Sequence, residues 1–247
     1  MADIKVQDVQ TSGAPDQGEA IIQKAKGFWA KFSKPIIYIG SAIILLIGGW
    51  FAYNNFYKQP KETKAEEALF QAEQLFDKMA EKGFNKDSIN LVLNGGTLAD
   101  GNIIKGVLNT ISKHGGTQAA NRAHYLAGAC YLHNKEFDKA IKQLKEYDGN
   151  GASQLQSMAY AMIGDAYAEL KKNDDALSYY KKAATVNEKD EFVTPDALMK
   201  AAMYCEVNNK PKDAIELYQK IKDNYPQSAQ AQTVDKYLAR LGVTDNK

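Results

Sequence analysis

The side chains that could hold a metal ion or carry out catalysis are few in this chain. His114, His124 and His133 are its three histidines, and the last two are nine positions apart, which is not a zinc-ligand spacing. Gly95-Gly96 and Gly115-Gly116 lack the Lys-Ser/Thr that follows a phosphate-binding loop, and no serine nucleophile motif is present. We therefore expect no catalytic residue, no metal site, no cofactor and no enzyme activity.

One apolar run divides the sequence. Residues 36–53 contain no Asp, Glu, Lys, Arg or His, and Lys34 and Lys58 flank them. About 20 apolar residues in a helix cross the hydrocarbon core of a bilayer, and aromatic residues at the far end suit its interface. This predicts a transmembrane helix over residues 35–57. A cleaved signal peptide is the alternative, but a polar segment precedes the run and no small-residue cleavage site follows it.

The segment before this run, residues 1–34, is predicted to be a cytoplasmic tail that is disordered or partly helical. Its first 20 residues are poor in apolar side chains. Residues 20–32 alternate lysines with apolar residues, and form either a short amphipathic helix or simply the start of the membrane helix. Four lysines in residues 20–34 against three in the equivalent stretch after the run favour a cytoplasmic N-terminus and an exported C-terminal domain.

The 190 residues after Tyr57 are enough for one domain with a sizeable core. They carry 26 basic and 26 acidic side chains, so their formal net charge is zero. Binding to nucleic acid depends on a basic surface that neutralises phosphates. A nucleic-acid partner is therefore not expected.

A repeat runs through the C-terminal half of the chain. Ala140, Ala176 and Ala214 are 36 and 38 residues apart, and each has similar residue types at the same offsets. A small residue lies twelve positions before each alanine and a large one four positions after it: Gly128, Gly164 and Ala202, then Leu144, Tyr180 and Tyr218. This pattern resembles the tetratricopeptide repeat. The resemblance implies an all-α solenoid of antiparallel helix pairs, with the small residues where paired helices approach closely.

We therefore expect three tetratricopeptide repeats with a C-terminal capping helix over residues 115–247. The preceding residues, 58–114, are predicted to be a linker and an irregular helical pair. Their helices are expected at residues 65–82, 87–93 and 103–114, and Pro60 is expected to bend or break the connection to the membrane helix. Cys130 and Cys205 fall in repeats one and three, about 20 Å apart at the usual helix spacing, so they are predicted to be unpaired core thiols.

The repeat frame also predicts a partner-binding groove on the first helix of each pair. Its candidate residues are Arg122, Tyr125, Leu132, Met158, Asp165, Met199, Met203 and Glu206. Tetratricopeptide clamps that hold a C-terminal carboxylate need several Lys, Arg and Asn residues on this face, whereas here only Arg122 qualifies and three carboxylates oppose it. The methionines indicate an adaptable apolar surface instead. The alternative is that they only contact a neighbouring helix.

Three stretches carry a more specific resemblance: Leu93-Asn-Gly-Gly96, Ile103-Ile-Lys-Gly-Val-Leu108 and Asn121-Arg-Ala-His-Tyr-Leu-Ala-Gly128. Together with the N-terminal anchor, they resemble the YfgM-like family of periplasmic tetratricopeptide proteins. That resemblance implies a single-pass protein of the inner (cytoplasmic) membrane that accompanies the Sec translocon. Its partners would be translocon components, a PpiD-like chaperone or exported clients. The alternative is a general tetratricopeptide adaptor in another membrane-associated assembly.

Overall fold

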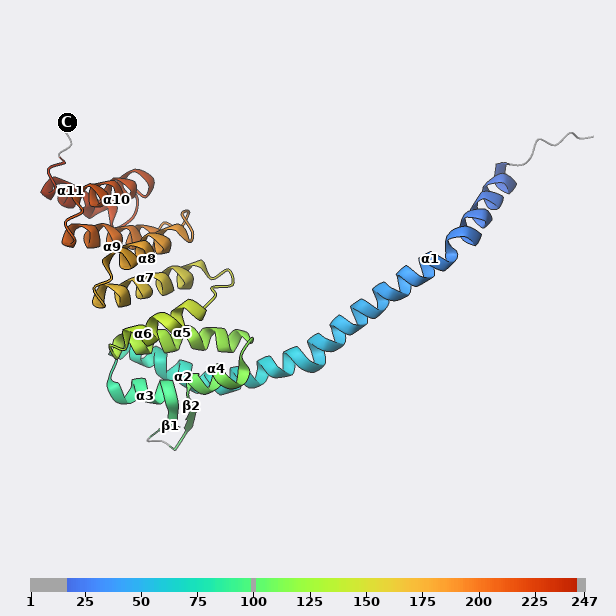
Figure 1. Cartoon of the computed structure of the whole chain (residues 1–247), viewed down its shortest axis with the longest axis horizontal. Helices are drawn as coiled ribbons and strands as arrows, with labels where there is room; N and C mark the ends of the chain where they lie inside the picture. Colours follow the sequence, from blue (N-terminus) through green and yellow to red (C-terminus); the bar gives the residue numbers. More distant parts are fainter. Residues whose placement is uncertain (1–16, 99–100, 244–247) are drawn as a thin grey trace, which may run out of the picture. The chain divides into compact units, whose positions relative to one another are not determined.

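The computed structural model describes residues 17–98 and 101–243. They divide into two compact units, one that ends at Gln59 and one that begins at Pro60. Within the first unit, helix α1 (Gln17–Tyr53) is followed by a π-helical turn, η1 (Asn54–Lys58) (Figure 1). Residues 17–34 are thus helical, and residues 20–32 form part of the long helix. The disorder predicted for residues 1–16 lies outside the described residues.

Helix α1 is apolar on every side over its second half. No residue between Ile21 and Gln59 is buried, and large side chains such as Leu45, Leu46 and Trp50 are mostly exposed. Among the described residues, this is the one helix long and apolar enough to cross a membrane.

The helical backbone continues through Pro60, so the break that was one of the two expected outcomes does not occur there. Pro60 is the second residue of α2 (Gln59–Lys82), directly after the π-helical turn. In that turn the N–H of Gln59 bonds to the carbonyl of Asn54, five residues back. A wider turn of this kind accommodates a proline ring that has no N–H to donate.

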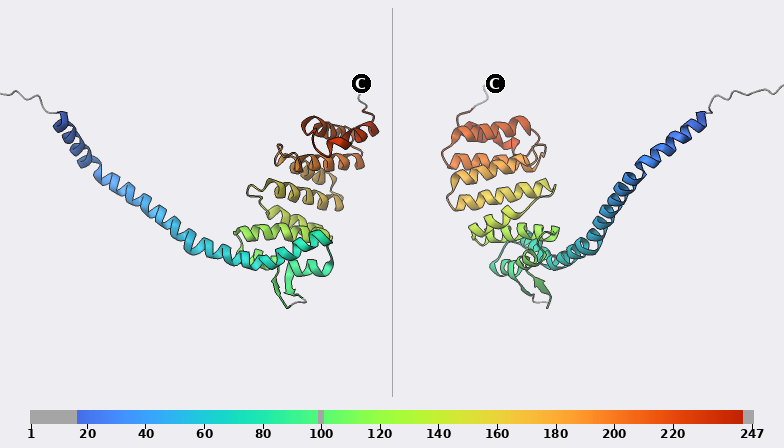
Figure 2. Two further views of the ribbon diagram at one scale, coloured as in Figure 1. Left: turned by 180° about the vertical axis from the view of Figure 1, so that it is seen from behind. Right: turned by 45° about the vertical axis from the view of Figure 1, so that its right-hand side comes forward.

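The second unit contains the remaining helices and two short strands. After α2 come α3 (Lys86–Asn94), β1 (Gly95–Thr97), β2 (Ile103–Lys105) and α4 (Val107–His114). Three antiparallel pairs follow: α5 (Gln118–His133) with α6 (Phe137–Glu146), α7 (Ser153–Glu169) with α8 (Asn173–Thr185), and α9 (Val193–Val207) with α10 (Pro211–Asn224). Helix α11 (Ala231–Arg240) closes the stack, and Figure 2 shows the pairs layered upon one another.

The strand pair corrects the prediction that a helix begins at Ile103. Residues 103–105 pair antiparallel with residues 95–97, so the helix starts only at Val107. Gly95 has φ 82°, and a β-carbon on Gly106 would lie 2.4 Å from the backbone of Asn94. These two glycines allow the hairpin to fold back against the end of α3.

Close packing within the first two pairs confirms the role predicted for Gly128 and Gly164. A β-carbon on Gly128 would lie 2.4 Å from Leu144, and one on Gly164 would lie 2.6 Å from the ring of Tyr180. Between the helices of each pair, Lys135, Lys171 and Asn209 occupy equivalent turn positions with positive φ. The N–H of the next residue bonds five residues back in all three turns, which ends the first helix in the same way each time.

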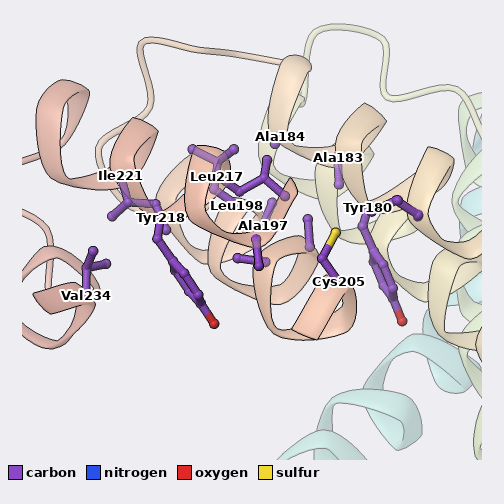
Figure 3. Close-up of a cluster of buried hydrophobic side chains, with 14 of the residues drawn as sticks. Tyr180, Ala183, Ala184, Ala197, Leu198, Cys205, Leu217, Tyr218, Ile221 and Val234 are labelled. Carbon is purple, nitrogen blue, oxygen red and sulfur yellow. The ribbon is translucent and has the colours of Figure 1, made fainter. Parts of the chain in front are cut away.

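The largest of the hydrophobic clusters joins α8, α9, α10 and α11. Figure 3 shows Tyr180 and Tyr218 projecting in the same direction on either side of Cys205, as expected for equivalent positions of a repeat. Cys130 belongs to a different cluster, around α2 to α6. Both cysteines are buried and free, and burial raises the pKa of the Cys130 thiol to about 12.

Candidate partner-binding groove

Three neighbouring hollows lie along the first helices of the repeats, and together we call them the groove. The first, about 330 Å³, lies between α2, α5 and α7 and is lined by Glu73, Phe76, Asp77, Arg122, Tyr125, Leu126, Tyr147 and Leu155. The second, about 200 Å³, lies between α7 and α9 and includes Met158, Ala161, Met162 and Asp165. The third, about 550 Å³, includes Met199, Met203, Tyr204 and Val207 and shares Asp196 and Lys200 with the second.

Arg122, the single cation among the predicted groove residues, is held by two carboxylates. Its Nε donates to Glu73 Oε1 at 2.8 Å, and its terminal nitrogens donate to both oxygens of Glu66. Hydrogen bonds to Glu66 and Glu73 raise the pKa of the guanidinium. Arg122 therefore joins α5 to α2, and its donors are already engaged.

Asp165 is paired in a similar way between two repeats. It accepts the hydroxyl of Tyr180 on α8 at 2.8 Å and the ammonium of Lys200 on α9 at 2.7 Å. Burial, followed by the charge of Asp165, raises the pKa of the Tyr180 hydroxyl. This carboxylate therefore ties the second repeat to the third.

Glu206 repeats the arrangement one layer further on. It accepts the hydroxyl of Tyr218 on α10, and both of its oxygens accept the guanidinium of Arg240 on α11 at 2.7 and 2.8 Å. The predicted polar residues Arg122, Asp165 and Glu206 thus form ion pairs between successive layers.

Of the five predicted apolar residues, four line the groove and one does not. Met158 and Met203 remain 48 % and 45 % exposed and line the groove, whereas Met199 also packs against the large cluster. Tyr125 lines the first hollow, with its ring 5.3 Å from that of Tyr147. Leu132 packs against two core clusters and lines none of the three hollows.

Sequence reasoning missed several lining residues. Leu155 and Met162 extend the apolar strip of Met158 along α7, and Val207, 81 % exposed, lies one turn beyond Met203. A helical spacing of three or four residues from the predicted methionines was the signal that could have identified them. Phe76 of α2 could not have been found this way, because it comes from outside the repeats.

The histidines belong to other surroundings. His124 Nδ1 lies 2.8 Å from Gln143 Oε1, and the ring of His133 stacks on Phe84 with centroids 3.6 Å apart. Burial lowers the pKa of His133. Among the described residues, no group of three or more His, Cys, Asp or Glu side chains could hold a metal ion.

Comparison with known proteins agrees with this geometry. Residues 108–154 and 158–229 match the family model described as Tetratricopeptide repeat, which covers α4 to α10. The matched helices α4 to α10 thus form tetratricopeptide-type repeats, and such repeats indicate an adaptor that binds other proteins. No curated protein matches the chain.

Proposed function

We propose that this chain is a membrane-anchored scaffold that binds a protein partner in the groove. The observation that carries the proposal is the exposed apolar strip of Leu155, Met158, Met203 and Val207 across consecutive repeats. Arg122, Asp165 and Glu206 beside it are occupied in ion pairs within the domain, so the strip supplies the apolar contact surface. Exposed apolar grooves of this kind commonly mark protein-binding sites.

Membrane attachment through α1 is the second part of the proposal. None of its uncharged residues 36–53 is buried, and in lipid a helix satisfies its own backbone hydrogen bonds. The lysines before the span favour a cytoplasmic N-terminus. We accordingly infer a single-pass protein of the inner membrane with a periplasmic repeat domain.

The finer assignment is an accessory role at the Sec translocon, beside a PpiD-like chaperone and in contact with exported clients. What supports it is the resemblance of residues 93–96, 103–108 and 121–128 to the YfgM-like family. A general adaptor role in another membrane-associated assembly is the second candidate. It is favoured because the described residues that line the groove show no feature specific to a translocon partner.

Anchoring and orientation are tested first. The full-length chain is expected in the membrane fraction after carbonate washing and in solution only with detergent. A C-terminal alkaline phosphatase fusion should be active, and a C-terminal green fluorescent protein fusion should be dark. A soluble full-length chain would exclude the anchor, and the reverse reporter pattern would exclude the periplasmic assignment.

The partner is tested by cross-linking in intact membranes, then capture of the full-length chain and mass spectrometry. Met203→Glu/Val207→Glu should lose the partners that the wild type captures. The control, Phe192→Glu, changes a residue 80 % exposed outside the groove and should retain them. Capture of translocon subunits supports the finer assignment, and capture of a different membrane assembly supports the general adaptor. Equal capture by the groove variant would exclude the groove.

A further inference from the structure

The charge around the groove differs from that of the domain as a whole. The lining residues include Glu73, Asp77, Asp165 and Asp196, and Glu66 adds a fifth carboxylate beside Arg122. Arg122 and Lys200 are the two cations that line the three hollows. Since the 190 residues after Tyr57 are neutral in total, the groove is an acidic region of a neutral domain.

Both of these cations are already committed. Arg122 is shared by Glu66 and Glu73, and the ammonium of Lys200 is 2.7 Å from Asp165. A carboxylate or phosphate entering the groove would therefore meet no uncommitted cation among its lining residues. It would also lie close to several negative charges, which disfavours an anionic peptide or an anionic lipid surface.

Acidic side chains remain available for an incoming cation. Asp77 is exposed in the first hollow, and Asp196 is exposed where the second and third meet, with the neutral amide of Gln230 at 3.3 Å. Glu169 is exposed one turn beyond Asp165 on the same face of α7. Asp77 shares the first hollow with Leu155, and Asp196 shares the other two with Met158, Met203 and Val207. Glu169 lies on α7, the helix that carries Leu155 and Met158.

The lining also constrains the backbone of the occupant. Most of the surface that the strip presents is aliphatic or thioether and offers no hydrogen bond. An extended peptide laid across it would leave backbone groups unpaired, whereas a helix satisfies them internally and presents one apolar face. Lysines or arginines beside that face would reach the exposed carboxylates.

We propose that the groove binds a cationic amphipathic helix of its partner, with the apolar face on Met158, Met203 and Val207 and the basic side chains beside Asp77, Glu169 and Asp196. This rests on the proposed function, because it specifies the chemistry of the partner at the same groove. Methionines suit such a role, since their flexible side chains repack around different apolar faces.

The test uses the full-length chain in neutral detergent, with photoreactive benzoylphenylalanine in place of Val207. The probe is a fluorescent helical peptide of about 18 residues, five turns, with leucines on one face and lysines on the other. The amount of cross-linked adduct is measured as the peptide concentration is raised, and this gives the half-saturation concentration. Because the photoreactive side chain lies in the groove, only peptide bound there contributes to the signal. A matched peptide with glutamates in place of the lysines tests the charge preference.

Three carboxylates are then neutralised together in the same chain, as Asp77→Asn/Glu169→Gln/Asp196→Asn. We expect the half-saturation concentration of the lysine peptide to rise about tenfold at low salt, because its interactions with three exposed carboxylates are lost. The control, Glu146→Gln/Glu216→Gln/Asp223→Asn, removes the same number of exposed carboxylates from α6 and α10 and should not change it. Thermal unfolding followed by circular dichroism verifies that each variant is folded.

Equal half-saturation in the neutralised variant, or equal labelling by the glutamate peptide, would overturn the inference. If the charge test fails but the chain still captures its partner through Met203 and Val207, the proposed scaffold function stands. Conversely, charge-dependent peptide labelling by a chain that stays outside membranes and captures no partner would remove the proposed function alone.

Discussion

Gly164 on α7 and Tyr180 on α8 lie so close that a β-carbon on the glycine would be 2.6 Å from two ring carbons. The ring has little freedom to retreat, because Tyr180 is buried and its hydroxyl donates to Asp165 at 2.8 Å. The packing of the second repeat therefore depends on the absence of a single methyl group.

Gly164→Ala is expected to destabilise the domain despite the better helix propensity of alanine. Overpacking a core costs about 1–3 kcal/mol, and replacing glycine in a helix recovers about 1 kcal/mol. The net loss should appear as a lower urea midpoint in circular dichroism at 222 nm, with an unchanged slope. An unchanged or higher midpoint would mean that α7 and α8 separate easily at this contact.

Thr110 and Thr117 provide a matched pair with opposite expectations. Thr110 Oγ1 on α4 is fully buried without a hydrogen-bond partner, whereas Thr117 Oγ1 caps α5 by accepting the N–H of Ala120 at 3.0 Å. Thr110→Val should stabilise the domain by about 1 kcal/mol, since it removes an unsatisfied hydroxyl. Thr117→Val should destabilise it by about 1 kcal/mol, through loss of the cap.

Both variants replace a threonine hydroxyl by a methyl group. Urea unfolding of the two therefore compares the same chemical change in two different surroundings. If Thr110→Val destabilises as much as Thr117→Val, the Thr110 hydroxyl has a partner in solution.

The pair between Glu206 and Arg240 is predicted to hold the closing helix. Glu206→Ala removes the acceptor of both Arg240 and the Tyr218 hydroxyl, and should cost about 2 kcal/mol. Hydrogen exchange at the amides of α11 should accelerate more than at those of α5. The control is Asp174→Ala, whose carboxylate pairs with Lys210 but is 95 % exposed, so its loss should cost clearly less than that of Glu206. Equal effects of the two variants would contradict this role of Glu206.

Asp190 is expected to contribute to acid sensitivity. Its carboxylate accepts the N–H groups of Val193 and Phe192 at 2.8 and 2.9 Å, and these bonds lower its pKa below the ordinary 3.8. The folded state then binds this proton less readily than the unfolded chain. The stabilisation is therefore complete well above pH 3.8 and is lost as the pH falls through the lowered pKa.

Asp190→Asn keeps an acceptor oxygen but does not titrate. Urea unfolding at several values between about pH 5 and pH 2 should show a smaller loss of stability in the variant than in the wild type. Parallel curves for the two proteins would show that Asp190 does not contribute.

The sequence alone was sufficient for the features set by local periodicity. The uncharged run of residues 36–53 predicts a long apolar helix, and α1 contains it. The recurring small residues predict where paired helices touch, and Gly128 and Gly164 lie against Leu144 and Tyr180. Such patterns are readable because a helix of fixed period turns residue spacing into a face.

Other features depend on which segment lies opposite. Ile103–Lys105 forms a strand because residues 95–97 pair with it, although its own sequence also suits a helix. Arg122 was placed correctly on the first helix of its repeat, but Glu66 and Glu73 of α2, 56 and 49 residues away, determine that it forms an internal ion pair. In the same way Lys200 and Arg240 engage Asp165 and Glu206 from the next layer. Periodicity fixes the face on which a side chain lies, but only the packing of distant helices decides whether that side chain is paired internally or left for a partner.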